Sequence, residues 1–260
     1  MDSPILIAPD PAAGTLTLTL NRPDRRNALN LPLLYALRKA VLAAPSVAGC
    51  RALVLRGAGP AFCAGMDLKE TADAPHETAE AVRDALLALA RCPLVTIAAV
   101  QGAAVAGGAG LAAACDFVLL ADDARIGFPE VKRGLVAALV TVFLRRQLRE
   151  RDLRDLLLLG ELLPASRAVT LGLANRAVPA AELAVETQRL VQELAGGGPH
   201  ALAATKALLH ELWPSTLEAD CARALAAHRD ARDSAEAREG AAAFLEKRPP
   251  AWAATSRVKH

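Results

Sequence analysis

Two glycine-containing turns are the features of this sequence whose residue types and spacing could do chemistry. Gly107 and Gly108 follow an apolar segment, residues 95–100, that has the length and composition of a buried strand, and they open a helical pattern. Glycine lets the backbone approach a ligand closely, and the first N–H groups of a helix have no acceptor within it. Such a helix start favours a developing negative charge.

A second turn, Gly65-Met66-Asp67, follows another strand-like segment at residues 51–56. Close helix packing or an ordinary strand-to-helix connection would also explain either turn alone. Two turns from adjacent strands could aim two backbone N–H groups at one point, which is how enzymes hold an oxyanion. Glu130 follows Pro129 in a loop between apolar segments, where an isolated charge is more often solvated.

The elements that must position these turns alternate between strands and helices. Strict alternation of apolar and polar residues predicts a half-buried strand over residues 14–20, and Asn30 is a suitable N-cap for a helix to about residue 44. The alternation indicates an α/β fold, with a loose strand–strand–helix rhythm. A glycine run before Pro199 suggests an α/β core domain over residues 1–198 and a helical part over 199–260. Further helices are predicted at about 79–91, 136–146, 152–159, 165–171 and 183–194, and a turn at 160–164.

Composition narrows the class of protein. The 260 residues are 53% hydrophobic, which is enough for one large core, and a net charge of +2 gives no global attraction to nucleic acid or to an anionic membrane. Five scattered cysteines without a C-x-x-C pair indicate reduced thiols, and no apolar run has the length of a membrane span. We therefore expect a soluble, cytoplasmic protein.

Familiar cofactor and metal motifs are absent from the sequence. It contains no G-x-G-x-x-G, no G-x-x-x-x-G-K-[ST], no H-E-x-x-H and no G-x-S-x-G. The five histidines are not spaced as metal ligands. We therefore expect neither a dinucleotide nor a metal site.

Short motifs follow one another along nearly the whole chain, and as a set they resemble one known family. They are Asn21-Arg22-Pro23, Asn27-Ala28-Leu29, residues 62–68, Gly102, Ala106-Gly107-Gly108, Ala114-Cys115-Asp116, Phe128-Pro129-Glu130-Val131, Gly134-Leu135, residues 172–175, Val178-Pro179 and residues 244–248. Their order and spacing resemble the enoyl-CoA hydratase/isomerase (crotonase) superfamily. The set is specific to the superfamily and much less specific to one reaction.

The resemblance implies a spiral of β-β-α units with a C-terminal helical part that forms trimers or pairs of trimers. It also implies an acyl-CoA thioester as substrate, with the thioester oxygen held by the backbone N–H groups of Met66 and Gly107. Coenzyme A is then part of the substrate, and no separate cofactor is expected. The residues matching the coenzyme A site are Ala28, Ala64, Gly65, Asp67, Leu68, Lys69, Gly108 and Pro129, with Arg25 and Arg26 near the phosphates and Lys247 reaching a neighbouring subunit.

The carboxylates depart from the two-glutamate hydratases of the family. The first glutamate position is Gly110, and the second is Glu130. Glu130 is the predicted acid/base, because burial beside Phe128 and Val131 would raise its pKa towards the working range. Asp67 and Asp116 are weaker candidates, since the residues matching them are more often structural.

A single carboxylate at the site is compatible with more than one reaction. We favour hydration of a 2-enoyl-CoA thioester, since one glutamate can activate water and then donate the proton. Isomerisation of a 3-enoyl to a 2-enoyl thioester needs only one base, and residues 134–137 also resemble branched-chain hydratases of the methylglutaconyl type. Other enolate chemistry, such as thioester hydrolysis or dehydration, is a further alternative.

A reading of another class is a non-catalytic coenzyme A-binding or RNA-binding member. The basic segment 145–151 could form a patch, although its intervening acidic residues indicate a solvated helix face. The retained Glu130 and both turns favour an enzyme. Apolar Leu135, Val136 and Leu139 suggest an aliphatic acyl chain, although core packing explains them equally well.

Overall fold

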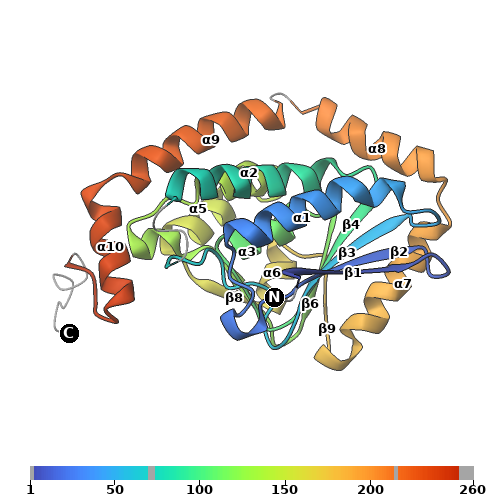
Figure 1. The fold of residues 1–260 in the computed structure, drawn as a ribbon, viewed down its shortest axis with the longest axis horizontal. Helices are drawn as coiled ribbons and strands as arrows, with labels where there is room; N and C mark the ends of the chain where they lie inside the picture. Colours follow the sequence, from blue (N-terminus) through green and yellow to red (C-terminus); the bar gives the residue numbers. More distant parts are fainter. Residues whose placement is uncertain (1–2, 70–73, 214–215, 252–260) are drawn as a thin grey trace.

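A six-stranded sheet forms the centre of the molecule in the computed structural model, which describes residues 3–69, 74–213 and 216–251 (Figure 1). The strand order is β1-β2-β3-β4-β6-β9, with β1 antiparallel to β2 and the remaining pairs parallel. The strands are β1 (Ile5–Asp10), β2 (Thr15–Leu20), β3 (Ala52–Gly57), β4 (Val95–Val100), β6 (Phe117–Ala121) and β9 (Arg176–Val178).

A second, smaller sheet lies beside the main one. Its order is β5-β7-β8, from β5 (Ala103–Val105), β7 (Arg125–Gly127) and β8 (Leu162–Pro164). An isolated parallel bridge between Cys63 and Ala104 attaches the loop after β3 to this sheet. Strands β4 and β6 of the main sheet are therefore each followed along the chain by a shorter strand of the second sheet, β5 and β7.

Helices follow the strand pairs in a repeating order. The chain runs β1-β2-α1, β4-β5-α3 and β6-β7-α4, while the unit β3-α2 has only the Cys63 bridge as its second strand. This order confirms the predicted α/β fold of β-β-α units. The helices are α1 (Leu31–Ala43), α2 (Pro75–Arg91), α3 (Gly107–Ala113), α4 (Ala138–Leu144), α5 (Glu150–Leu159), α6 (Ala165–Leu171), α7 (Leu183–Ala195), α8 (Pro199–Glu211), α9 (Leu217–Arg232) and α10 (Ala235–Leu245).

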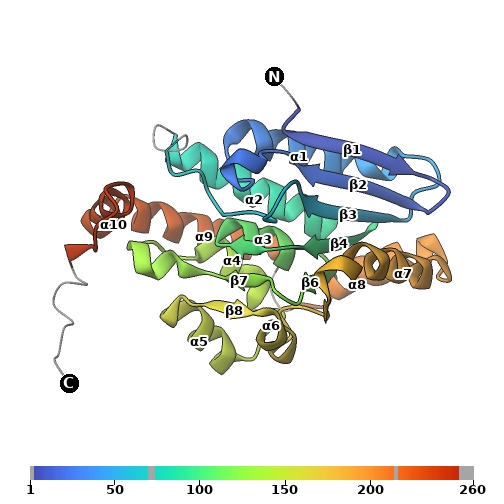
Figure 2. The same ribbon diagram turned by 90° about the horizontal axis from the view of Figure 1, so that it is seen from below.

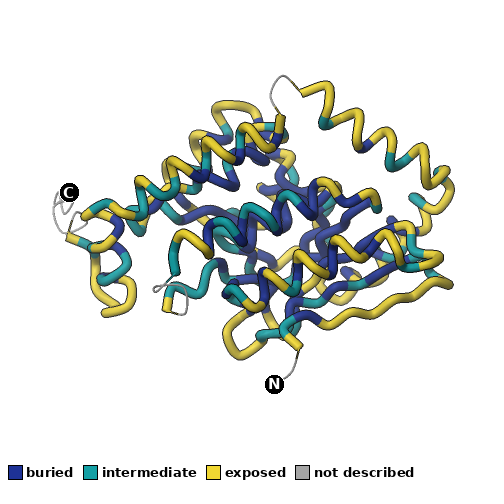
Figure 3. The backbone as a smooth tube through the Cα atoms, turned by 45° about the horizontal axis from the view of Figure 1, so that its top comes forward, coloured by how far each residue is buried: buried dark blue, intermediate teal, exposed yellow. Residues whose placement is uncertain are grey.

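The last helices wrap around the α/β core. Helices α1 and α2 cover one face of the sheet, α9 packs across α2 and α4, and α10 lies at one end (Figures 1 and 2). Burial is concentrated in the strands and in the inward faces of α1 to α4, whereas the outer side of α8 is exposed (Figure 3). None of the described helices is both long enough and apolar enough to cross a membrane.

An ion pair between buried Lys206 and the more exposed Asp116 attaches α8 to the core. The Lys206 Nζ lies 2.6 Å from the Asp116 Oδ2 and 3.2 Å from the Leu94 carbonyl oxygen. The same Asp116 oxygen accepts hydrogen bonds from the backbone and hydroxyl of Thr96. Asp116 therefore has the structural role that the family pattern implied.

Several predicted elements need correction. The predicted turn at 160–164 contains β8, because Gly160 ends α5 in a left-handed conformation and the next residues pair with β7. Strand β1 went unpredicted, because it is an edge strand in which only Ile5 is buried and which contains Pro9. Helix α2 begins at Pro75 rather than near residue 79. The predicted helix N-cap at Asn30 is confirmed, since its side chain accepts from Leu33 N–H at 3.1 Å.

Candidate active site

The turn at Gly65-Met66 is fixed by backbone hydrogen bonds on both sides. The Leu29 N–H donates to the Gly65 carbonyl at 2.8 Å, and the Asp67 N–H donates to the Leu29 carbonyl at 2.9 Å. Gly65 has a φ of 90°, and a Cβ there would lie 2.9 Å from the Val105 carbonyl oxygen, so glycine is required. The Met66 N–H lies between these bonded groups, and the described residues offer it no hydrogen-bond acceptor.

The second turn places Gly107 at the start of α3. Ala106 precedes it with φ 53° and ψ −123°, which is a strained conformation for a residue with a Cβ. The Ala106 N–H donates to the Gly127 carbonyl at 2.8 Å, which fixes the strained peptide in place. As the first helical residue, Gly107 has no acceptor for its N–H within α3, and none is found elsewhere in the described chain.

Cys63 brings the two turns together. Its N–H donates to the Ala103 carbonyl at 3.0 Å, and its carbonyl accepts from the Val105 N–H at 2.9 Å. A Cβ on Gly108 would lie 2.5 Å from the Cys63 carbonyl oxygen, so α3 packs directly on this loop. Met66 and Gly107, whose N–H groups have no acceptor among the described residues, consequently line one cavity.

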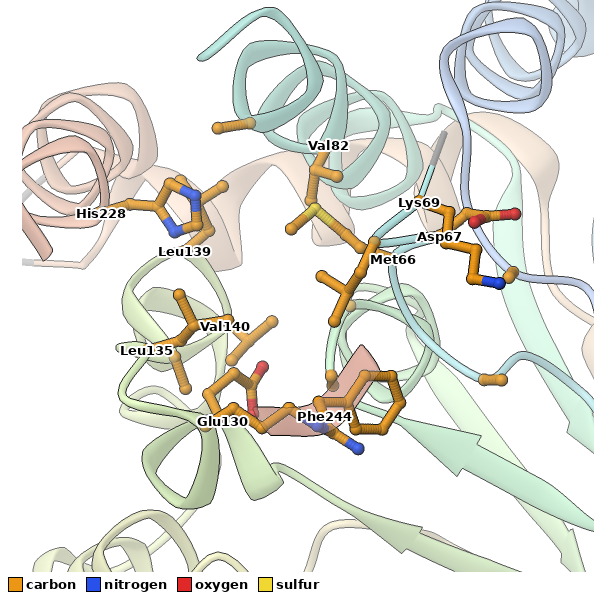
Figure 4. A pocket seen from close by; sticks show the side chains of 18 of the residues that line it. Met66, Asp67, Lys69, Val82, Glu130, Leu135, Leu139, Val140, His228 and Phe244 are labelled. Carbon is orange, nitrogen blue, oxygen red and sulfur yellow. The ribbon is translucent and has the colours of Figure 1, made fainter. Parts of the chain in front are cut away.

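This cavity has a volume of about 390 Å³ and is lined mainly by apolar side chains. Figure 4 shows Asp67 and Lys69 on one side of it, Met66 between, and His228 on the opposite side. Arg25, Arg26 and Arg133 are further cationic residues that line the cavity. The apolar wall comes from Val82 on α2 and from Leu135, Val136, Leu139 and Val140 in and before α4.

Glu130 projects into the cavity from the turn between β7 and α4 (Figure 4). Its Oε2 is buried and has no hydrogen-bond partner among the described residues. Burial raises the pKa of this carboxyl group to about 7, against smaller lowering effects from its own backbone N–H and from Arg133. The predicted rise is confirmed, although of the two predicted neighbours only Phe128 is buried, whereas Val131 is 40% exposed.

The place of a first glutamate is filled by an apolar side chain. Gly110 lies on α3, and a Cβ there would lie 2.5 Å from the Val140 Cγ1 and 3.6 Å from the Leu86 Cδ2. Val140 belongs to α4 and lines the cavity beside Glu130 (Figure 4). A longer side chain at position 110 therefore has no room unless Val140 moves.

The remaining predicted site residues fall into three groups. Ala28, Ala64, Asp67, Leu68 and Lys69 line the cavity. Gly65, Gly108 and Pro129 do not line it, and they shape the backbone of the residues next to them. Lys247 is exposed after α10 and is not a lining residue in this single chain, so its contact with a neighbouring subunit stays a prediction.

Asp67 is engaged in holding the site together. Its Oδ2 lies 3.2 Å from the Arg22 Nη2, and the Arg22 Nη1 donates to the Ala28 carbonyl at 2.5 Å. This contact ties the loop after β3 to the turn before α1. The carboxylate of Asp67 is thus a structural group at the edge of the cavity.

The lining residues that were not assigned to the site from the sequence include Arg133, His228 and Phe244. The Arg133 guanidinium lies 4.6 Å from the centre of the Phe244 ring, and burial lowers its pKa. Phe244 belonged to one of the motifs, but no local pattern connected it to the cavity. His228 lies on α9, almost a hundred residues after Glu130, and only the fold brings it to the site.

Comparison with known proteins identifies the family. The sequence profile of the enoyl-CoA hydratase/isomerase family matches residues 10–255. A candidate enoyl-CoA hydratase of Thermus thermophilus is 42% identical over 238 residues, which cover 89% of this chain and 94% of that protein. The mitochondrial enoyl-CoA hydratase domain-containing protein 3 of Homo sapiens is 30% identical over 244 residues, covering 92% of this chain and 80% of that protein.

A solved structure has the same fold over nearly all of its length. The crystal structure of an enoyl-CoA hydratase from Mycobacterium avium matches with a TM-score of 0.86 at 34% identity, covering 97% of this chain and 100% of that one. The family profile also spans most of the chain. The chain therefore belongs to the enoyl-CoA hydratase/isomerase (crotonase) family of enzymes.

Proposed function

We propose that the protein is an enoyl-CoA hydratase, which adds water across the double bond of a 2-enoyl-CoA thioester. The observation that carries the proposal is the buried Glu130 Oε2, which has no partner among the described residues and borders the same cavity as two unpaired backbone N–H groups. A carboxyl group with a pKa of about 7 can accept and return a proton near neutral pH. Arg25, Arg26 and Lys69 supply positive charge for the phosphates of coenzyme A.

In the proposed reaction, the N–H groups of Met66 and Gly107 hold the thioester oxygen. The Glu130 carboxylate takes a proton from water while the water oxygen bonds to C3, and the π electrons of the C2=C3 bond move towards the thioester oxygen to form an enolate. The enolate then collapses, and Glu130 returns the proton to C2. Loss of one oxyanion donor typically lowers the rate on the order of a hundredfold to a thousandfold. The step needs no cofactor, since coenzyme A is part of the substrate.

Isomerisation of a 3-enoyl-CoA to a 2-enoyl-CoA thioester is the second candidate, and Val140 is the observation that favours it. This side chain fills the space in front of Gly110, where two-glutamate members carry their other carboxylate. A single base suffices to move a proton between C4 and C2, whereas a hydratase with one carboxylate must position its water with fewer groups. The same oxyanion donors would stabilise the dienolate of this reaction.

Product analysis separates the two candidates. The purified protein is incubated with matched 2-enoyl-CoA and 3-enoyl-CoA thioesters, and the products are resolved by chromatography and mass. Addition of one water to the 2-enoyl substrate, lost in Glu130→Gln and kept in the exposed-site control Glu182→Gln, is the expected result. Conversion of the 3-enoyl substrate without a change in mass would replace hydration by isomerisation. Tight binding of coenzyme A without turnover of either would indicate the non-catalytic alternative.

The RNA-binding alternative is less well supported. In the basic segment, Arg149 pairs with Asp152 at 2.7 Å, Arg154 pairs with Glu150 at 2.8 Å, and Arg146 lies within 5.2 Å of the centre of the Trp213 ring. These contacts support a solvated, internally neutralised helix face. An RNA shift assay at increasing salt is the test, since phosphate binding would weaken steeply.

We also propose that the chain assembles as a homotrimer or a dimer of trimers. The support is a group of exposed apolar side chains on and after α8, the part of the chain where the family resemblance places subunit contacts. Leu208 is 50% exposed, Leu209 68% and Leu212 74%. Light scattering coupled to gel filtration would measure the assembled mass.

A further inference from the structure

His228 lies on the side of the cavity opposite Lys69 (Figure 4). It projects from α9 and borders the cavity together with Val82 and Leu139 (Figure 4). Met66, whose N–H we assign to the thioester oxygen, lies between His228 and Lys69 in this view. A substrate whose coenzyme A moiety is near Lys69 therefore extends its acyl chain towards His228.

The imidazole presents one unused nitrogen at this end. Its Nε2 is buried and has no hydrogen-bond partner among the described residues. The backbone of Val136 acts in the opposite direction to burial and raises the pKa of the ring. In the neutral ring one nitrogen carries the proton and the other accepts, and a hydroxyl group can pair with Nε2 in either case.

The surroundings keep the ring neutral. Burial lowers the pKa of His228, and the nearby positive charges of Arg232, His76 and Arg229 lower it further. Glu80 forms an ion pair with Arg229, and Asp233 lies 3.5 Å from His76, so the adjacent carboxylates are already engaged. A buried polar nitrogen without a partner is destabilising, and a hydrogen-bonding group on the ligand would remove that cost.

Building on the proposed function, we propose that His228 selects an acyl chain that carries a hydroxyl group at its distal end, with the hydroxyl hydrogen-bonded to Nε2. A plain aliphatic chain fits the apolar wall but leaves Nε2 unpaired. Chains with and without a hydroxyl differ little in a purely apolar pocket, whereas a buried polar group that lacks its partner discriminates strongly. His228 is thus a specificity-determining residue for the reaction proposed above.

Binding of saturated acyl-CoA thioesters tests this inference without relying on turnover. Calorimetry compares plain, terminally hydroxylated and terminally carboxylated chains of matched length. We expect the wild-type protein to bind the hydroxylated chain about tenfold more tightly than the plain one. His228→Leu should reverse this preference, and His228→Gln, which keeps an acceptor oxygen, should retain part of it. The exposed His200→Leu on α8 is the control that should change nothing.

The other outcomes overturn the inference in distinguishable ways. Equal affinity for plain and hydroxylated chains would mean that a water molecule satisfies Nε2 and that His228 selects nothing. Preference for the carboxylated chain would mean that the ring binds as a cation. Hydratase activity together with either result would leave the proposed function intact, whereas failure of every thioester to bind would overturn both proposals.

Discussion

Glu130→Gln is predicted to make the protein more stable at alkaline pH while removing its activity. Burial raises the pKa of this carboxyl from 4.5 to about 7. Between these values the unfolded chain releases the proton more readily than the folded one, so the stability contributed by Glu130 is lost as pH rises from about 4.5 to 7. A shift of this size corresponds to at most about 3 kcal/mol of unfolding free energy above pH 7.

Glutamine has nearly the same shape and no charge, so it avoids this loss. Thermal unfolding of wild type and Glu130→Gln should coincide near pH 4.5 and diverge as pH rises, with the variant melting several degrees higher at pH 8. In the same variant, turnover of the preferred enoyl thioester should fall by about 10² to 10⁴, the usual contribution of a general acid/base. Wild-type kcat/KM should rise with pH and level off above about 7, since the carboxylate is the active form.

Both halves of this prediction can fail separately. Glu182→Gln on the surface provides the control for removal of one negative charge, and it should change neither the pH dependence of stability nor the turnover. If the melting temperatures of Glu130→Gln and wild type differ equally at all pH values, the carboxyl is not titrating from a buried position. If turnover survives the substitution, Glu130 is not the acid/base.

Three further substitutions test the backbone and packing contacts that support the site. Ala106→Gly should raise the melting temperature by a few degrees, because relief of about 1–3 kcal/mol of strain exceeds the added chain entropy, and a lower value would refute the strain. Gly108→Val should lower both stability and turnover, because its side chain would overlap Cys63, and unchanged melting would show that α3 can move away. Lys206→Met should destabilise by about 1 kcal/mol by removing the charged partner of Asp116, and Asp116→Asn in the same chain should recover part of that loss in a melting experiment.

Features with a local physical cause could be predicted from the sequence. The alternation at residues 14–20 predicted β2, and the N-cap residue Asn30 predicted the start of α1. Both patterns depend only on residues that are neighbours in the sequence. The turns at Gly65 and Gly107 were found for the same reason. The predicted turn at residues 160–164 was wrong. Three of these residues form β8 by pairing with β7, and this tertiary contact leaves no pattern in the segment itself.

The parts of the site that need long-range packing could not be predicted. Gly110 indicated that one carboxylate is missing, but only the contact between α3 and α4 shows that Val140 fills its place. His228 was considered only as a possible metal ligand, and nothing near it in the sequence distinguishes it from a surface histidine. Both residues reach the cavity through helices whose position depends on the whole fold.

The residues proposed to carry the reaction and those proposed to select the acyl chain come from different structural elements. The proposed oxyanion donors and Glu130 come from turns that are fixed by backbone hydrogen bonds within the two sheets, so their geometry changes little when side chains change. The acyl end is made by side chains of α2, α4 and α9, which contact one another through side-chain packing and through ion pairs such as Glu80–Arg229. Substitutions at Val140 or His228 can therefore alter which acyl chain fits without disturbing the donors. The groups of the proposed enolate chemistry therefore lie in turns next to the sheets, whereas the residues that would select the acyl chain lie on the surrounding helices.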